Sequence, residues 1–200
     1  IIYLLLPRLQ KKCMTKIRIM EKEKIENLRQ NYQSIELSEK KIAKNPIEQF
    51  ENWFNDALNA NLYEPNAMTL ATTSIDRKPS ARIVLLKGVD EKGFVFYTNY
   101  LSAKGKEIAK NPVVALVFFW AELARQVRIE GTVEKLSKEA SEQYFHSRPR
   151  GSQLGAIVSP QSQILASRDD LEKSWKDLEQ EYENKILPKP AHWGGYLVKP

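Results

Sequence analysis

Apolar residues recur at helical spacing in two parts of the chain, and each part begins with residues that commonly start a helix. Asn45 followed by Pro46 suits the first turn of one helix, and Ser167 precedes the other with Asp170 in the position of a capping box. The positions expected to face a core are Ile47, Phe50, Phe54 and Leu58 in the first helix and Leu171, Trp175, Leu178 and Tyr182 in the second.

Shorter helices are predicted elsewhere by hydroxyl residues that suit the N-cap position. These residues are Ser102, Ser137 and Ser152. Residues 16–33 are charged and contain neither Pro nor Gly, so they predict a further helix, whereas residues 34–44 are polar and predict irregular structure.

Between residues 67 and 133 the pattern changes to short runs rich in Thr, aliphatic and aromatic residues, which predict β-strands. The expected strands are 67–75, 80–86, 94–98, 113–120 and 126–133, with a last one starting at Trp193. The run 113–120 is almost wholly apolar and predicts a strand buried on both faces, whereas 126–133 alternates. Because tight turns join consecutive strands, the predicted fold class is mainly β with flanking helices, in an antiparallel barrel.

The net charge of +6 belongs to the first part of the chain. Residues 1–45 carry 11 Lys and Arg against 5 Asp and Glu, whereas residues 46–200 carry 20 of each. We therefore expect a basic, partly mobile extension over residues 1–45 and one folded domain over 46–200. A domain without basic bias disfavours nucleic-acid binding.

Cysteine and histidine are too rare for several classes of site. Cys13 is the one cysteine, which excludes an internal disulfide framework, and the two histidines, His146 and His192, argue against a metal centre and are expected to be structural.

The apolar run at the start has six residues before Pro7, too few to cross a bilayer. We expect a cytoplasmic protein that binds no metal and no membrane.

The segment 144–162, YFHSRPRGSQLGAIVSPQS, concentrates polar side chains that pack poorly with one another. They are Tyr144, Arg148, Arg150, Ser152, Gln153, Gln161 and Ser162. Guanidinium groups and hydroxyls suit the oxygens of a phosphorylated, aromatic small molecule. The alternative, equally open on local chemistry, is a polar loop between two helices.

A second candidate anion site lies where the strand ending at Tyr97 and Thr98 meets the helix that begins beside Lys104. A helix N-terminus with a hydroxyl and a cation attracts anions, although simple capping by Ser102 explains the same residues. Arg82 and Lys87 stand near the two ends of the strand ARIVLLK. Either they bind two different ligands, or one of them is a surface charge. Gln126 is expected to bind either a heterocycle or a neighbouring strand edge. Together these residues indicate two phosphate-bearing ligands.

The chain has neither the GxGxxG pattern of a Rossmann site nor a P-loop.

Six ordered blocks resemble the pyridoxamine 5'-phosphate oxidase family. They are RIVLLK (82–87), FYTNYLSAKG (96–105), RQVRIEG (125–131), YFHSRPRGSQLGA (144–156), SPQS (159–162) and HWGGY (192–196). The resemblance implies an FMN-binding split barrel, assembled as a homodimer with FMN at the subunit interface. It also implies oxidation of pyridoxamine or pyridoxine 5'-phosphate to pyridoxal 5'-phosphate, with O2 as acceptor and H2O2 released. Hydride would pass from C4' of the substrate to N5 of the flavin.

The resemblance also implies roles for residues of this chain that match the family's motifs. FMN would be held by Arg82, Ile83, Val84, Leu85, Leu86, Lys87, Tyr97, Thr98, Lys104, Gln126, Gln161 and Ser162. The substrate phosphate would be held by Lys87, Tyr144, Arg148 and Ser152, and a segment from Arg29 to Tyr32 would close over the substrate. The catalytic base stays unassigned.

Two departures from the family's pattern bear on activity. Ala103 stands where many relatives have an Arg beside the Lys at the helix start. The family pattern also continues past the position of Pro200 with a Trp-Gln-Gly and an Arg-Leu-His-Asp-Arg segment, so we expect a domain without this C-terminal part. The alternative to an oxidase is therefore a split-barrel protein that binds flavin or pyridoxal 5'-phosphate without efficient turnover.

Overall fold

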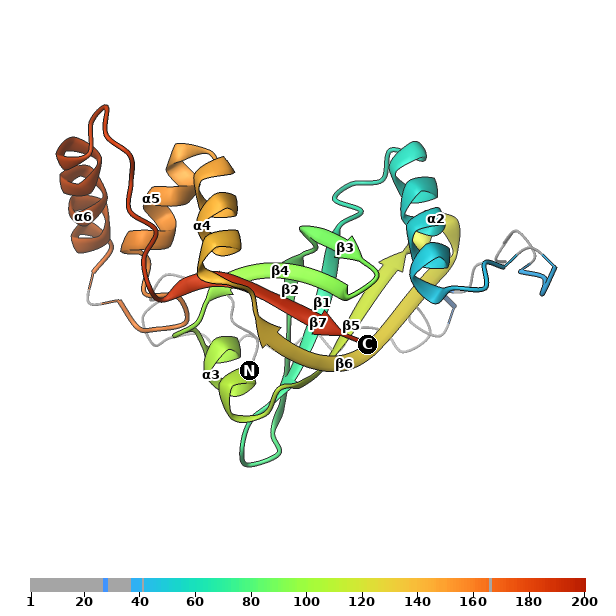
Figure 1. The fold of residues 1–200 in the computed structure, drawn as a ribbon. Helices are drawn as coiled ribbons and strands as arrows, with labels where there is room; N and C mark the ends of the chain where they lie inside the picture. The colour runs from blue at the N-terminus through green and yellow to red at the C-terminus, as the bar shows by residue number, and fades with distance from the viewer. Residues whose placement is uncertain (1–26, 29–36, 41, 166) are drawn as a thin grey trace. The chain divides into compact units, whose positions relative to one another are not determined.

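The computed structural model describes residues 27–28, 37–40, 42–165 and 167–200. The chain divides into two units, residues 1–33 and 34–200, and the helices and strands described below all belong to the second unit (Figure 1). The helix expected over residues 16–33 lies outside the described residues apart from positions 27 and 28, as do Arg29 and Tyr32.

Seven strands of the described chain form one antiparallel sheet. They are β1 (Ala67–Thr73), β2 (Pro79–Leu85), β3 (Gly88–Asp90), β4 (Gly93–Asn99), β5 (Val113–Trp120), β6 (Arg125–Lys135) and β7 (Trp193–Lys199). Their order across the sheet is β2-β1-β5-β6-β7-β4-β3, so the last strand in sequence lies between β6 and β4. The sheet curls along its long strand β6 (Figure 1). The prediction of a mainly β, antiparallel fold with flanking helices is confirmed.

Five α-helices accompany this sheet within the described residues. They are α2 (Pro46–Asn59), α3 (Ala103–Lys110), α4 (Lys138–Ser147), α5 (Arg150–Val158) and α6 (Arg168–Glu181). The predicted caps of four helices are confirmed, because each side chain accepts a hydrogen bond from a backbone N–H of the first turn. These caps are Asn45, Ser102, Ser137 and Ser167.

The predicted cap at Ser152 is wrong. Helix α5 begins at Arg150, directly after Pro149, and the backbone N–H groups of Ser152 and Gln153 both donate to the carbonyl of Pro149. Because proline holds φ near its helical value and needs no hydrogen-bond partner for its nitrogen, Pro149 starts the helix without a side-chain cap.

The main hydrophobic core lies between helix α2 and the sheet. Phe50 of α2 is 2% exposed, and its ring centroid lies 4.9 Å from that of Phe94, 5.0 Å from Phe118 and 6.1 Å from Trp120. Ala57, two turns further along the helix, is fully buried and faces the same core. The amphipathic spacing that predicted this helix therefore places Ile47, Phe50 and Phe54 against the sheet. The prediction that Leu58 faces the core is wrong, because Leu58 is 47% exposed near the end of the helix.

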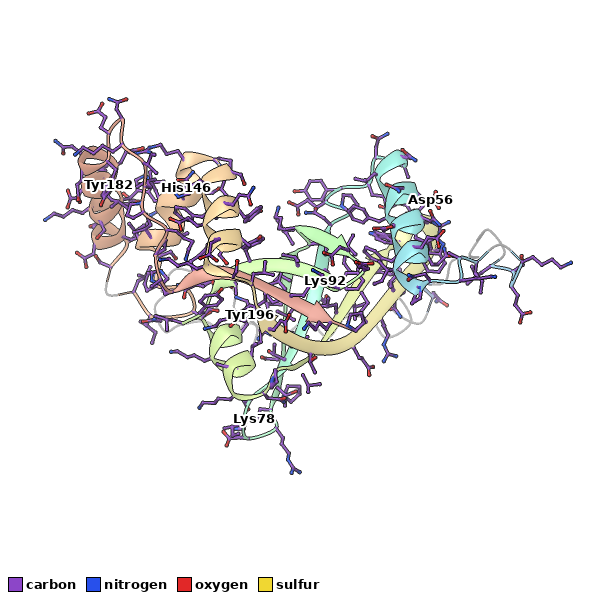
Figure 2. All side chains as sticks on the ribbon, viewed as in Figure 1. Asp56, Lys78, Lys92, His146, Tyr182 and Tyr196 are labelled. Atoms are coloured by element: carbon purple, nitrogen blue, oxygen red, sulfur yellow. The ribbon has the colours of Figure 1, made fainter. Side chains whose placement is uncertain are left out.

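Strand β7 also has its inner residue in this core. Tyr196, labelled in Figure 2, is 2% exposed, and its ring packs against those of Phe96 at 5.5 Å and Tyr100 at 5.1 Å. Burial raises the pKa of Tyr196 to about 12, so its phenol is neutral throughout the physiological range.

The prediction that the strand over residues 113–120 is buried on both faces is wrong. In β5 the inward residues Val114, Leu116 and Phe118 are buried, whereas Val113 is 56% and Phe119 is 66% exposed. An antiparallel sheet commonly has one face on the core, and the apolar outer residues of β5 lie on the opposite face. Strand β5 is therefore buried on one face only, although its exposed face is also apolar.

Helices α4, α5 and α6 enclose a second, smaller core with the start of β7. Its buried members are Phe145, Leu154, Leu187 and Trp193. The indole of Trp175 on α6 lies against α5 at Gly151 and Gly155, where an added Cβ would come within 3.8 Å and 3.4 Å of the ring.

In the described part of the chain, no helix combines the length and apolarity needed to cross a membrane.

We expect Phe50→Ala to lower the free energy of unfolding by about 3–5 kcal/mol, because it removes a ring that contacts three core aromatics. Tyr63→Ala is the matched control, since Tyr63 is 90% exposed and its loss should change stability by less than about 0.5 kcal/mol. Urea denaturation followed by circular dichroism measures both. Equal losses would contradict the assignment of Phe50 to the core.

Candidate functional site

A cavity of about 450 Å³ lies where the two halves of the sheet meet helices α3, α4 and α5. Its walls come from β2, the end of β4, the first turn of α3, the C-terminal end of α4, α5 with the loop after it, and the first residue of β7. Segments far apart in the sequence therefore meet here because β7 pairs with β4.

Three cations line this cavity, and its lining includes no carboxylate within the described chain. They are Lys87, Lys104 and Arg148. Lys87 follows β2 and is held in place by its backbone N–H, which donates to Val95 at 2.8 Å. Cations gathered without counter-charges favour an anionic ligand.

The junction of β4 and α3 positions Lys104. Ser102 is fully buried; its hydroxyl donates to the carbonyl of Asn99 at 2.7 Å and accepts from the N–H of Gly105 at 3.3 Å. At Gly105 a Cβ would lie 2.2 Å from the carbonyl oxygen of Tyr100, so only glycine allows this close approach of the helix. Lys104 is thus held 7% exposed, and burial together with the charge of Arg82 lowers its pKa.

Arg82 does not line the cavity; it lies behind it. Its guanidinium pairs with Glu107 of α3 at 3.1 Å and also donates to the hydroxyls of Thr72 and Ser80. Burial alone would raise the pKa of the Glu107 carboxyl. Hydrogen bonds from Thr72 and Ser80 and the charge of Arg82 outweigh this effect and lower the pKa. This cluster ties β1 and β2 to α3 and keeps Glu107 charged and engaged.

Arg148 also lines the cavity, over an aromatic stack. Its guanidinium carbon is 4.5 Å from the ring centroid of Trp193, and its Nη1 is buried without a hydrogen-bond partner among the described residues. The Tyr97 ring stacks on Tyr144 at 3.8 Å and on Trp193 at 5.4 Å. Burial lowers the pKa of Arg148 and raises the pKa values of both tyrosines, which are neutral hydrogen-bonding groups.

Most residues that the sequence nominated for binding meet at this cavity. Those that line it are Ile83, Val84, Leu85, Lys87, Tyr97, Thr98, Lys104, Tyr144, Arg148, Ser152 and Gln161. The hydroxyl of Thr98 donates to the side-chain oxygen of Gln161 at 3.2 Å, which joins the end of β4 to the loop after α5.

Other nominated residues lie elsewhere in the described chain. Leu86 is buried in the main core, Gln126 is exposed on β6 opposite Phe119, and Ser162 is exposed in a turn with a φ of 64°. Ser162 follows Gln161 directly but is not part of the cavity wall.

Two polar residues of the segment 144–162 serve the helices instead of the cavity. Arg150 donates to the carbonyl oxygens of Lys185 and Tyr182 beyond the end of α6. The side-chain amide of Gln153 donates to the carbonyl of Arg148 at 2.8 Å. Gln153 therefore fixes the local backbone at Arg148, whereas Arg150 ties the start of α5 to the chain after α6.

The sequence reasoning missed Trp193 and Asn99 as cavity residues. Trp193 belongs to the HWGGY block, which is part of the family resemblance but suggested no binding role for this residue. Its place beside Arg148 depends on the pairing of β7 with β4, in which Trp193 lies opposite Asn99, 94 positions away in the sequence. Of the histidines, His192 lies 3.2 Å from the carbonyl oxygen of Ala156 through Nε2, and His146 is exposed on α4. No cluster of metal-ligating residues occurs in the part of the chain that the structure describes.

Comparison with known proteins gives a family for this arrangement. A family model described as pyridoxamine 5'-phosphate oxidase matches residues 54–181. A protein of Acaryochloris marina named pyridoxine/pyridoxamine 5'-phosphate oxidase is 57% identical over 176 residues, covering 88% of this chain and 80% of the relative. A protein of the same name from Salinibacter ruber is 56% identical over 178 residues, covering 88% and 83%.

Solved structures share the fold. PhzG from Burkholderia lata, solved in complex with tetrahydrophenazine-1-carboxylic acid, superposes with a TM-score of 0.78 at 25% identity, covering 84% of this chain and 83% of that one. A pyridoxamine 5'-phosphate oxidase-related, FMN-binding protein from Nostoc punctiforme gives a TM-score of 0.61 at 16% identity, over 80% and 83%, which supports the split-barrel fold alone. With its family match and its identity to these relatives, the chain belongs to the pyridoxamine 5'-phosphate oxidase family.

Proposed function

We propose that this protein binds FMN and oxidises pyridoxamine or pyridoxine 5'-phosphate to pyridoxal 5'-phosphate, with O2 as acceptor and H2O2 as product. The observation that carries the proposal is a cavity lined by three cations and an aromatic stack, with one buried Arg148 nitrogen left without a partner among the residues that the structure describes. Family membership supports the same reaction.

The wall around Lys104 fits the phosphate of FMN. Its ammonium group and the start of α3 offer donors to an anion, and Gln161, whose side-chain oxygen accepts from Thr98, offers its amide N–H groups to a heterocycle. Ile83, Val84 and Leu85 of β2 also line the cavity. FMN, when bound, accepts a hydride from the substrate and returns the electrons to O2.

The wall around Arg148 fits the phosphate of the substrate. Arg148, Tyr144 and Ser152 come from α4, α5 and the link between them, and Lys87 is a further cation of the cavity lining. Holding the phosphate at one wall and the flavin at the other fixes the orientation of the substrate ring between them. Such positioning supplies up to about 7–11 kcal/mol of rate acceleration in favourable cases.

The overall reaction balances as a two-electron oxidation. The alcohol substrate loses a hydride and a proton to become an aldehyde, and O2 gains two electrons and two protons to become H2O2. With the amine substrate, water replaces the nitrogen, which leaves as ammonia. The chain's own part is to bind, orient and shield; the proton acceptor is unassigned.

We also propose a homodimer in the cytoplasm. Strand pairing puts Phe119, Gln126, Val117 and Ile83 on the same outer face of the sheet, and Phe119 and Ile83 are 66% and 64% exposed. A second copy covering this face would bury the apolar residues and bring Gln126 to a shared site. The single cysteine, Cys13, accords with a reducing compartment.

We expect the purified protein to be yellow, to sediment as a dimer, and to release H2O2 when pyridoxamine 5'-phosphate is added in air. Absorbance spectra, analytical ultracentrifugation and a peroxidase-coupled assay measure the three properties. Flavin binding without peroxide would favour the alternative of a non-oxidase binding protein, and a colourless dimer that ignores FMN would contradict both.

We expect Lys104→Ala to weaken FMN binding roughly 10- to 100-fold, because it removes a charge-assisted contact at the helix start. Quenching of flavin fluorescence on titration measures the dissociation constant. Lys106→Ala is the matched control, since Lys106 lies exposed on the same helix. An unchanged FMN affinity in the Lys104 variant would refute this assignment.

We expect Arg148→Leu to raise KM for the phosphorylated substrate roughly 10- to 100-fold while the FMN dissociation constant changes by less than about twofold. Steady-state kinetics with FMN titration separates the two effects. Arg150→Leu controls for loss of an arginine nearby, because Arg150 is not part of the cavity lining and, among the described residues, its hydrogen bonds go to the end of α6 and the loop beyond. Equal weakening of both ligands would argue against separate phosphate sites.

A further inference from the structure

Within the described chain, Arg148 is the one arginine of the cavity lining, and its Nη1 lacks a hydrogen-bond partner. We propose that Trp193 is a positioning residue, whose ring face holds the Arg148 guanidinium at the substrate-phosphate wall and so sets selectivity for phosphorylated ligands. This proposal rests on the proposed function, because it assigns Arg148 to the substrate phosphate.

A ring face holds a guanidinium without using its N–H groups. The Arg148 guanidinium carbon is 4.5 Å from the Trp193 centroid, within the range of a cation–π contact. Among the described residues Arg148 forms no ion pair, and its Nη1 has no hydrogen-bond partner. A carboxylate in place of the ring would occupy these donors and repel a phosphate. The indole instead leaves the donors available to phosphate oxygens.

Trp193 itself is fixed by its surroundings. It is 6% exposed, its backbone N–H donates to Pro190 at 3.1 Å, and its carbonyl accepts from Lys189 Nζ at 3.1 Å. Its ring meets Phe145 edge-on at 5.5 Å. The indole is therefore held in a fixed position, against which the long and flexible side chain of Arg148 packs.

The two glycines after Trp193 allow the stack to close. A Cβ at Gly194 would lie 2.2 Å from the hydroxyl of Tyr100, and one at Gly195 would lie 2.8 Å from the Tyr97 ring. Without side chains there, β7 approaches β4 closely enough for Tyr97 to lie nearly parallel to Trp193, at an interplanar angle of 15°. The HWGGY block thus specifies where the ring under Arg148 lies.

The competing explanation is that Trp193 only fills the second core, where it contacts Phe145. Trp175 offers a matched control, because it packs in the same cluster but lies against the glycines of α5. A packing role and a positioning role differ in how the substitution depends on Arg148 and on the phosphate of the ligand.

The test uses FMN-loaded protein and two inert probes, 4'-deoxypyridoxine 5'-phosphate and its dephosphorylated form, with dissociation constants from calorimetry. We expect Trp193→Leu to weaken the phosphorylated probe roughly tenfold and Trp193→Phe about threefold, with the unphosphorylated probe unchanged. Trp175→Leu should leave both unchanged. In the Arg148→Leu background, Trp193→Leu should add less than about twofold, because the cation is already gone.

Several outcomes would overturn the proposal. They are equal weakening of the two probes, an undiminished effect of Trp193→Leu in the Arg148→Leu background, or an effect of Trp175→Leu as large as that of Trp193→Leu. If Trp193→Leu does not fold, Trp193→Phe and its combination with Arg148→Leu decide the matter by the same criteria. Loss of probe binding on Arg148→Leu alone, with none on either Trp193 variant, would refute the positioning role and leave the proposed function standing. A wild-type protein that binds neither FMN nor the phosphorylated probe would refute the proposed function itself.

Discussion

Positive charge removed from water without a negative partner is the interaction on which this site depends. Lys104 is 7% exposed, a buried nitrogen of Arg148 has no partner in the described chain, and burial lowers the pKa of both groups. Each group would be more stable beside an anion. The fold supplies no carboxylate at the cavity wall as described, so a ligand phosphate is the natural complement.

The carboxylate of Glu107 lies on the same helix as Lys104, but the fold holds it outside the cavity lining. Glu107, one turn after Lys104 on α3, is engaged by Arg82, Thr72 and Ser80. Two neighbouring lysine and glutamate residues on one helix would otherwise neutralise each other. By binding Glu107, the two hydroxyls and Arg82 keep its carboxylate from neutralising Lys104. Arg82 therefore matters to the site even though it does not line the cavity.

The features that the sequence predicted well are local ones, and those it missed depend on distant contacts. Caps such as Asn45 and Ser102 act on backbone groups within three residues, so the pattern alone reveals them. The partners of Arg150 lie more than thirty positions away, at the end of α6, and the ring beneath Arg148 comes from β7. The outer face of β5 is apolar although it is exposed, so composition alone predicted the wrong burial. The motif resemblance nominated most cavity residues because it encodes such long-range proximity indirectly.

The central position of β7 has a consequence for how the chain acquires its structure during synthesis. Strands β1, β2, β5 and β6 can pair as they leave the ribosome, and β3 can pair with β4, but the two sets are joined through β7. Residues 193–199 emerge after all the others that build the sheet. The nascent protein therefore cannot join the two halves of its sheet, or complete the lining of the ligand cavity, until residues 193–199 have emerged.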